Sequence, residues 1–428
     1  MRISSVTVIL IISLVTLMQG ARAADKVSPA NAVVPASVFT TNDLPVAELG
    51  KPVWAGTHGA GITYYDKWVY AVSAAESILQ FECDPVTAKL TYKGATPLGY
   101  QNKDSVKGVV IRTWVRPVDD NHAKLVLFYG DHNKGLSWYG IDKSTGKLTF
   151  ESVQCPAKCD HHNATHLVTP DQQHFCYGGR VLDKVDWYRF GEDGLPVPDG
   201  SFALTNFSTG NVGMSSGCVM ASPDWKQMYC MVFQCDDKDP KNDKTPQIDT
   251  YTIDLKTHAG TYVSTLKLPA PDTMKGRVSG TLEPFSPDGK STYAILRTGN
   301  IACYYTLARD PKTGSLTVAG PGPNVSAGNL GGLTGAPWSR QDRFAYAADG
   351  QSGYFVNNGP VERFNRDPAT GALTLLPSVP GMGASKLALD PVNGVLFTAG
   401  EKIASFKMPD KDGDAEIARA VSTFLAAH

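Results

Sequence analysis

Short apolar runs rich in Val, Ile, Tyr, Phe and Thr alternate with polar turns along most of the chain. The runs at 68–74 and 344–348 are examples, and their composition is typical of β-strands. Inside this region no segment of useful length has apolar residues at helical spacing. The tail at 414–427 does, because Ile417, Val421 and Phe424 follow a helical period. The pattern therefore predicts an all-β body with a tail that is either helical or a last outer strand.

Two kinds of turn punctuate the runs, and each recurs seven times. One reads Asp-x-x-Thr-Gly-x-Leu-Thr, with intact copies and degenerate ones that begin at Asp84, Asp142, Asp193, Asp254, Asp310, Asp367 and Asp412. The other is a polar turn before an apolar run, as in Pro287-Asp-Gly, and its copies begin at Asp66, Asp120, Pro170, Pro223, Pro287, Arg340 and Pro391. Asp, Gly and Thr supply the positive-φ and side-chain-bonded positions that hairpins need.

The spacing of the turns indicates a repeated supersecondary unit. Successive copies of the first turn lie 45 to 61 residues apart, and a unit of that size with two hairpin turns is a four-stranded antiparallel sheet. One such sheet cannot bury both faces, but radial stacking against neighbours does so. We therefore predict an all-β, seven-bladed β-propeller of four-stranded antiparallel blades. The segment 53–57 is expected to close the ring by completing the last blade.

The ends of the chain differ from the repeat region. Arg2, an apolar run from Val6 to Met18 and the small residues around Ala23 are typical of a signal peptide over 1–23. A signal anchor is the alternative reading. We expect an extended arm over 24–49, the propeller over 50–410 and the tail over 411–428. The protein is then exported, to the periplasm or the extracellular space, and no second stretch is long enough to span a membrane.

Composition narrows the class of partner. The net charge is −1 with a pI near 6.7, so there is no electrostatic footprint for nucleic acid. Eight cysteines in an exported chain permit up to four disulfides, and the cheapest local pairings are Cys155 with Cys159 and Cys230 with Cys235. Cys155 and Cys159 precede His161 and His162 closely. A disulfide-pinned loop that presents the two histidines is the favoured interpretation, and a metal site is the alternative.

The alternating turns resemble those of the lactonase-type seven-bladed propellers, which include 6-phosphogluconolactonase and the fungal carboxymuconate-lactonising enzyme. The resemblance covers roughly residues 50–408. It implies a propeller with a His-bearing, cationic pocket. Counted from Pro170, one His position of the family falls on Ala164, and His162 stands two residues earlier. The family's Pro-Arg-His stretch is replaced by 216–218, and Ser385 stands where the last unit carries arginine, with Lys386 beside it.

The inner strands of a propeller bring distant residues to one channel mouth, and this predicts the site. His162 would be the general acid or base, and Glu283 would orient it or act as the base. Arg297 and Arg277 would clamp a carboxylate or a developing oxyanion. The remaining substrate-binding candidates are His161, Arg112 and Lys386. Each has a plainer reading: Arg112 and Arg297 can form blade-to-blade ion pairs, and Glu283 can be a turn acid. No metal and no cofactor are predicted.

Two functions follow from these expectations. The first is an exported lactonase-like hydrolase or cycloisomerase that acts on a small carboxylated or sugar lactone. The second is a non-catalytic propeller that binds a ligand or a protein as a scaffold. In both cases we expect a monomer that binds no nucleic acid and has no membrane span.

Overall fold

The computed structural model describes residues 35–40, 43–44, 61–73, 77–99, 110–119, 122–129, 136–154, 165–178, 184–191, 196–205, 214–234, 245–269, 271–272, 278–298, 301–326, 343–347, 349–356, 359–400 and 402–408. Residues 35–408 fall in one compact unit. Within the described ranges the regular structure is all strand, and none of it is a helix long and apolar enough to cross a membrane. The expected signal peptide and C-terminal tail lie outside these ranges.

The strands form five four-stranded antiparallel sheets and one seven-stranded sheet. Blade 1 holds β2 (Gly61–Tyr65), β3 (Trp68–Ser73), β4 (Ser77–Cys83) and β5 (Leu90–Pro97). Blade 2 holds β6 (Val110–Pro117), β7 (His122–Tyr129), β8 (Leu136–Asp142) and β9 (Leu148–Gln154). Blade 3 holds β10 (Thr165–Val168), β11 (His174–Gly178), β12 (Lys184–Phe190) and β13 (Pro196–Ala203). Blade 4 holds β14 (Met214–Ala221), β15 (Gln227–Gln234), β16 (Gln247–Asp254) and β17 (Ala259–Lys267). Blade 5 holds β18 (Ser279–Leu282), β19 (Ser291–Thr298), β20 (Ile301–Arg309) and β21 (Leu316–Ser326).

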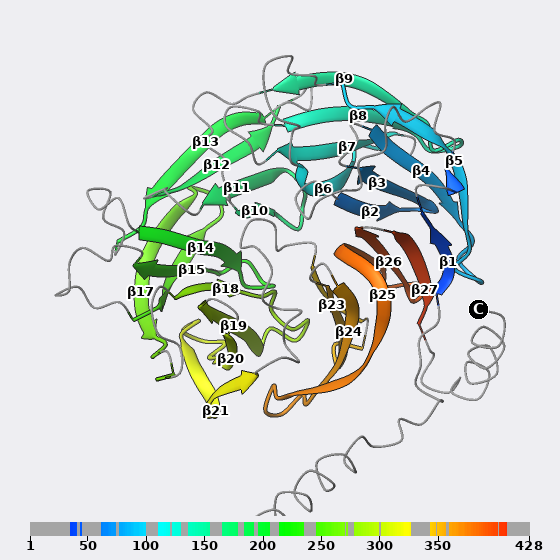
Figure 1. Cartoon of the computed structure of the whole chain (residues 1–428). Coiled ribbons are helices and arrows are strands. Elements are labelled where there is room, and N and C mark those ends of the chain that lie inside the picture. Colours follow the sequence, from blue (N-terminus) through cyan, green and yellow to red (C-terminus); the bar gives the residue numbers. More distant parts are fainter. Residues whose placement is uncertain are drawn as a thin grey trace, which may run out of the picture. The chain divides into compact units, whose positions relative to one another are not determined.

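The seven-stranded sheet is two blades joined by one long strand. It contains β22 (Phe344–Tyr346), β23 (Ser352–Val356), β24 (Gly359–Arg366), β25 (Leu373–Asp390), β26 (Val395–Gly400), β27 (Ile403–Lys407) and β1 (Pro35–Phe39). The first part of β25 pairs with β24 and ends blade 6, and from Ala384 onward β25 pairs with β26 and begins blade 7. The predicted seven-bladed propeller is therefore confirmed, and its blades surround a centre lined by their first strands (Figure 1).

The ring closes through the N-terminal side of the chain, but not through the segment we predicted. Strand β1 pairs with β27, so Pro35–Phe39 is the outermost strand of blade 7. It lies within the range expected to be an extended arm, and the predicted 53–57 segment lies outside the described residues. Ser37 Oγ accepts a hydrogen bond of 2.9 Å from the Leu90 amide of blade 1, and Phe39 packs on Phe81. This strand therefore joins the last blade to the first.

The hydrophobic core lies between neighbouring blades, as stacking of two-faced sheets requires. One cluster joins blades 7 and 1 through residues such as Phe397 and Phe81, and another joins blades 1 and 2 through Tyr70 and Leu125. Blades 3, 4 and 5 share a larger cluster that contains Trp187 and Tyr229. Apolar side chains of neighbouring blades thus pack on one another in these clusters.

Both kinds of turn lie where the repeat predicts, with one change of register. The Asp-x-x-Thr-Gly turns join the third and fourth strands, and Gly146, Gly314 and Gly371 have φ of 70°, 76° and 73° there, a region that favours glycine. The other turn joins the first and second strands. In blade 6 that turn is Ala347–Gln351, with Gly350 at φ 65°, and not the segment from Arg340. The expected copy was wrong because Asp349-Gly350 lacks the preceding proline.

The turns also tie one blade to the next. Asp288 in the blade 5 turn pairs with Arg366 at the end of β24 in blade 6, with Oδ2 to Nη2 at 3.0 Å. Asp224 in blade 4 pairs in the same way with Arg309 in blade 5. Burial raises the pKa of each aspartate, but hydrogen bonds from Ser286 or Ser222, a backbone amide and the arginine outweigh it, so the pKa of each lies below the ordinary value.

Replacing the buried arginine of one such clamp is expected to destabilise the fold. Arg366 also donates to Ser291 Oγ and to the Gly350 carbonyl oxygen, so Arg366→Met leaves three acceptors short of a donor. We expect a loss of about 2–4 kcal/mol in chemical unfolding. The depressed pKa of Asp288 stabilises the fold above about pH 4, and this contribution is lost as the pH falls through the folded pKa. The free energy of unfolding of Arg366→Met should therefore fall less than that of the wild type as the pH is lowered.

The exposed pair of Lys67 with Glu82 gives the matched control, since a surface pair contributes about 0–1 kcal/mol. Equal losses in Lys67→Met and Arg366→Met would show that burial of the clamp has no energetic consequence.

The cysteine expectation needs correction. Cys83, Cys176, Cys230 and Cys303 are buried thiols and not half-cystines. The local pairing of Cys230 with Cys235 is therefore wrong, and with four of eight cysteines as thiols at most two of the four permitted disulfides remain. Burial raises the pKa of Cys83 to about 12 and that of Cys303 to about 11, which keeps both protonated. Cys155 and Cys159 lie outside the described residues.

Candidate functional site

The first strands of the blades contact one another and line the centre of the ring, so they carry any channel site. Of the predicted site residues, His161, His162 and Arg277 lie outside the described residues. Arg297 lies on β19, where its backbone pairs with Ser279 of the first strand β18. Arg112 and Lys386 lie on first strands, and Glu283 directly follows one.

Glu283 and His166 occupy the same position in their blades. In blades 3 to 6 an equivalent backbone hydrogen bond spans the first turn, and its amide donors are Thr169, Ser222, Ser286 and Ala347. Three residues before each donor stand His166, Val219, Glu283 and Phe344. An imidazole and a carboxyl group therefore lie at one level of the ring, on blades 3 and 5. Both side chains are buried, at 2% and 5% exposure.

Glu283 lies in a polar setting between blades 5 and 6. Thr281 Oγ1 donates to its Oε1 at 3.1 Å, and Thr292 Oγ1 donates to its backbone oxygen at 2.6 Å. Burial raises the pKa of Tyr346, on the first strand of blade 6, well above its ordinary value, and the charges of Tyr293 and Glu283 add to that rise. The carboxyl group is thus held by a hydrogen bond within blade 5, and its charge contributes to the raised pKa of Tyr346 in blade 6.

Arg112 connects two blades through the backbone. Its Nη1 donates to the carbonyl oxygen of His166 in blade 3. Arg112 therefore contacts the neighbouring blade, and the acceptor of this hydrogen bond is a backbone carbonyl oxygen. The His166 ring lies against Phe128 at 4.6 Å and near Tyr177 at 6.1 Å between centroids, and these contacts fix its orientation.

Lys386 lies on the part of β25 that begins blade 7, and it is 2% exposed. Its neighbour Ser385 donates from Oγ to the Ala399 carbonyl oxygen at 3.2 Å. A lysine buried to this degree keeps its charge only beside polar or charged partners. The last blade therefore places a lysine on a first strand, one residue beyond the position where the family resemblance implies arginine.

Two residues near the centre were not predicted. His166 follows the His161-His162 stretch, but it lies on the inner strand itself, four residues before Pro170. Arg343 precedes β22 and is buried at 6% exposure. We did not identify Arg343 as a site residue from the sequence because we assigned the segment from Arg340 to the turn. Correct register would have placed Arg343 directly before the inner strand of blade 6.

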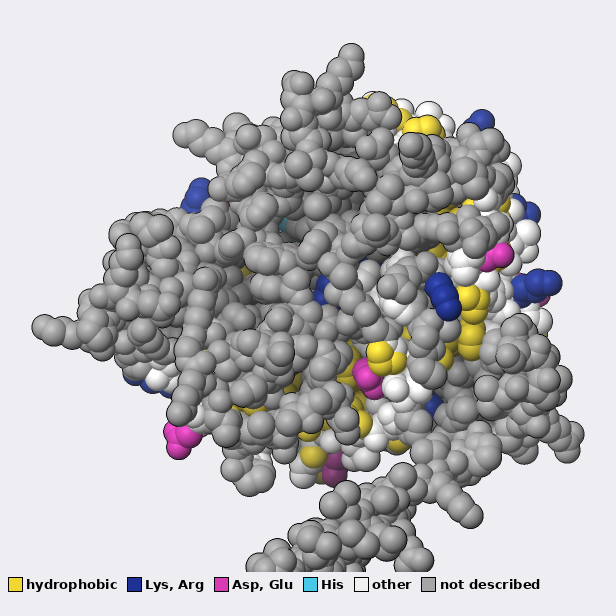
Figure 2. All heavy atoms as spheres, in the orientation of Figure 1, with side chains coloured by type: hydrophobic (Ala, Val, Ile, Leu, Met, Phe, Trp, Pro, Cys, Tyr) yellow, Lys and Arg dark blue, Asp and Glu magenta, His cyan; other side chains and the backbone are white. Residues whose placement is uncertain are grey.

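The first strands and the residues beside them thus carry acid–base groups on blades 3 and 5 and basic residues on blades 2, 6 and 7. A carboxyl or imidazole group can move a proton, and guanidinium or ammonium groups can stabilise a developing oxyanion. On the face drawn in Figure 2, the visible Lys, Arg, Asp and Glu side chains are interspersed and do not collect into one patch of a single sign.

Comparison with known proteins supports the architecture. No family model and no curated protein matches the chain. The solved periplasmic gluconolactonase of Pseudomonas aeruginosa is 16% identical with a TM-score of 0.50, over 76% of this chain and 86% of that one. A candidate 6-phosphogluconolactonase from Bacteroides fragilis is 15% identical with a TM-score of 0.50, over 79% and 86%. Raptor from Chaetomium thermophilum is 10% identical with a TM-score of 0.54, over 83% of this chain and 28% of that one.

At these identities the likeness shows the fold alone. Within that limit, it confirms the resemblance to the lactonase-type seven-bladed propellers.

Proposed function

We propose that this chain is an exported, lactonase-like enzyme that opens a small carboxylated or sugar lactone at the centre of the ring. The observation that carries the proposal is that two buried titratable side chains, His166 in blade 3 and Glu283 in blade 5, stand at equivalent positions before the first turn of their blades. The likeness in fold to a periplasmic gluconolactonase supports the choice of a lactone and of export.

The proposed reaction is hydrolysis through a tetrahedral intermediate. A general base, His162 or Glu283, takes a proton from water as the water oxygen attacks the lactone carbonyl carbon. Arg297 stabilises the oxyanion that forms, while Arg277, His161, Arg112 and Lys386 hold the carboxylate and hydroxyl groups of the substrate. Collapse of the intermediate breaks the ring C–O bond. The protonated base then returns its proton to the departing ring oxygen, so that the product is an open hydroxy acid.

A panel of lactones tests this function. The wild-type protein should hydrolyse at least one carboxylated or sugar lactone, measured by acid release at constant pH. His162→Ala should lower kcat/KM by about 10²-fold, the lower end of the effect of removing an acid–base group. Turnover of no lactone by the wild type would favour the second function, a propeller that binds without chemistry. Equal turnover by both proteins would remove the role of His162.

A further inference from the structure

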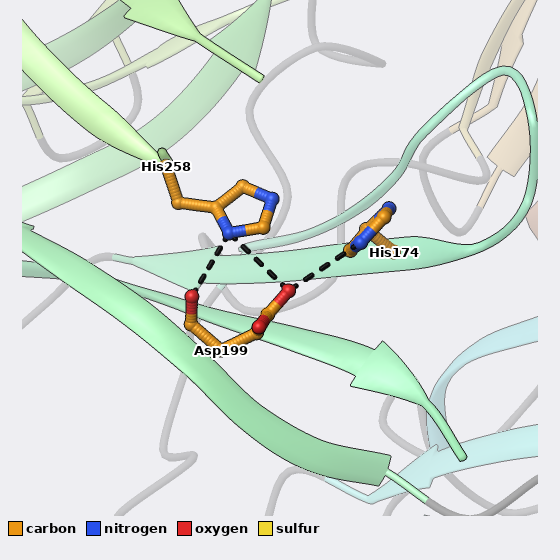
Figure 3. A group of neighbouring side chains, drawn as sticks. All are labelled: His174, Asp199 and His258. Atoms are coloured by element: carbon orange, nitrogen blue, oxygen red, sulfur yellow. Dashed lines mark hydrogen bonds and ion pairs between the residues drawn. The ribbon is translucent and has the colours of Figure 1, made fainter. Parts of the chain in front are cut away.

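A His–Asp–His group lies between blades 3 and 4, away from the first strands (Figure 3). His174 begins β11 and Asp199 lies on β13, both in blade 3, and His258 lies in the turn between β16 and β17 of blade 4. Asp199 Oδ2 is 3.4 Å from His174 Nε2 and 3.3 Å from His258 Nδ1. One ligand atom from each of the three side chains lies within 4.8 Å of the others.

A β-bulge places Asp199 in this group. Trp187 pairs with Gly200 and Tyr188 pairs with Pro198, so Asp199 is the extra residue of the bulge. Gly200 has φ of 132°, and a Cβ there would lie 3.4 Å from His258 Cβ. A bulge re-aims the extra side chain, and glycine beside it admits the neighbouring blade.

His258 occupies a position that blades 2, 5 and 6 give to glycine and that blade 1 gives to Ala88, with φ of 60°. In the corresponding turns the left-handed residue is Gly146, Gly314 or Gly371, whereas His258 has φ of 56°. A non-glycine residue in this region is uncommon, although histidine adopts it more often than most residue types. In blade 2 the left-handed Gly146 faces Trp68 of blade 1. The fold therefore brings this turn residue onto the preceding blade, and in blade 4 that residue is an imidazole.

The hydrogen bonding of His258 leaves one ring nitrogen available. Its Nδ1 is 2.9 Å from the Asp199 carbonyl oxygen, which can only accept, so Nδ1 carries the proton. Nε2 is then a lone-pair acceptor, and it is buried without a hydrogen-bond partner among the described residues. The ring is 5% exposed and stacks on Trp187 at 4.6 Å. An Nδ1–H donated to a carbonyl oxygen with Nε2 unbound is the arrangement typical of a metal-ligating histidine.

The corresponding place in blade 2 holds an ordinary ion pair. In blade 2 the equivalents of His174 and Asp199 are Lys124 and Glu151, which form a pair at 2.9 Å. The interface of blades 4 and 5 has the clamp of Arg309 with Asp224, but blade 4 has Ile253 in place of that arginine. The contact between blades 3 and 4 thus replaces cations of fixed charge with two imidazoles.

We propose that His174 Nε2, an Asp199 carboxylate oxygen and His258 Nε2 bind one divalent transition-metal ion of the Zn²⁺ class between blades 3 and 4. Imidazole and carboxylate ligands suit this class, and a fourth position is left for water. Ligands of tetrahedral Zn²⁺ with bonds of about 2.0–2.1 Å lie about 3.3 Å apart, so the side chains must move together from their present spread of up to 4.8 Å to bind the ion. His174 and Asp199 are 27% and 28% exposed, and the ion can therefore reach them from solvent.

Zinc titration of the chelator-treated, full mature protein by calorimetry tests the site. Because other residues of the chain can also bind zinc, the readout is the difference between variants. The ligand variant His174→Ala should lose one equivalent of Zn²⁺, or bind it more than about 100-fold more weakly. The matched control His122→Ala removes an exposed histidine that pairs with Asp119, and it should bind as the wild type does.

A second measurement is the thermal unfolding midpoint with and without Zn²⁺, because an ion bound between blades 3 and 4 should stabilise their contact. Zn²⁺ should raise the thermal midpoint of the wild type and of His122→Ala, and it should not do so for His174→Ala or Asp199→Asn. Circular dichroism without metal checks that each variant folds. Wild-type stoichiometry and affinity in His174→Ala, or an equal zinc-dependent rise of its midpoint, would overturn the proposal. Lactone turnover is not needed for either readout.

Discussion

Glu283→Gln should reduce kcat/KM on an accepted lactone by about 10²–10⁴-fold while the fold is kept. Glutamine has nearly the same shape as glutamate and can still accept the 3.1 Å hydrogen bond from Thr281 Oγ1. It cannot take up a proton near neutral pH, so a general base or a group that orients one by its charge is lost. Steady-state kinetics of the purified variant, with its unfolding midpoint as a check, measure the effect.

Thr281→Val is the matched control for that substitution. It removes the hydroxyl that holds Glu283 but leaves the carboxyl group, so the loss of kcat/KM should be much smaller than in Glu283→Gln. If Glu283→Gln turns over lactone at the wild-type rate, Glu283 is only a buried structural acid. If Thr281→Val loses as much activity as Glu283→Gln, the hydroxyl and not the carboxyl group carries the effect.

Removal of residues up to Thr40 should destabilise the propeller by about 4–6 kcal/mol. The truncation deletes β1, leaves blade 7 with three strands and exposes the edge of β27. It also removes the ring contact of Phe39 with Phe81 and the Ser37 acceptor for the Leu90 amide. Loss of an aromatic core contact alone costs about 3–5 kcal/mol, which is a large part of the stability of an ordinary domain. Guanidinium unfolding measures the change.

A truncation that ends at Val34 is the control, because it keeps the whole of β1. It should unfold at nearly the midpoint of the mature protein. A shorter form without residues up to Thr40 that is as stable as this control would mean that another segment closes the ring, and the segment 53–57 would again be the leading alternative. A loss of stability that appears only in the form without residues up to Thr40 would support closure of the ring by β1.

The sequence determined the architecture because turn chemistry is local. Left-handed glycines such as Gly146 and Gly371, and the Asp side chains before them, mark their hairpins within a few residues. The one error of register, in blade 6, arose where Asp349-Gly350 lacks proline and a neighbouring segment resembles the motif more closely. Strand number, blade number and the order of strands then follow from counting.

Closure and disulfide pairing could not be read in this way. Strand β1 pairs with β27 from the other end of the chain, and nothing in the composition of Pro35–Phe39 marks it as a strand of the last blade. Cys230 lies five residues from Cys235, but its side chain is fully buried in the core of blades 3 to 5. Proximity in sequence favours a disulfide only where the two side chains can face each other.

For the candidate sites, too, part could be predicted from the sequence and part required the tertiary structure. The sequence by itself predicted that polar residues of the first strands would share the ring centre, and it named Glu283, Arg112 and Lys386. Only the tertiary structure showed that Arg112 is engaged by a backbone carbonyl, that His166 matches Glu283 in position, and that His174 and His258 meet across two blades. The physical reason is that periodicity fixes where a strand begins and which way it runs, whereas the partner of a side chain depends on the packing of one blade on the next.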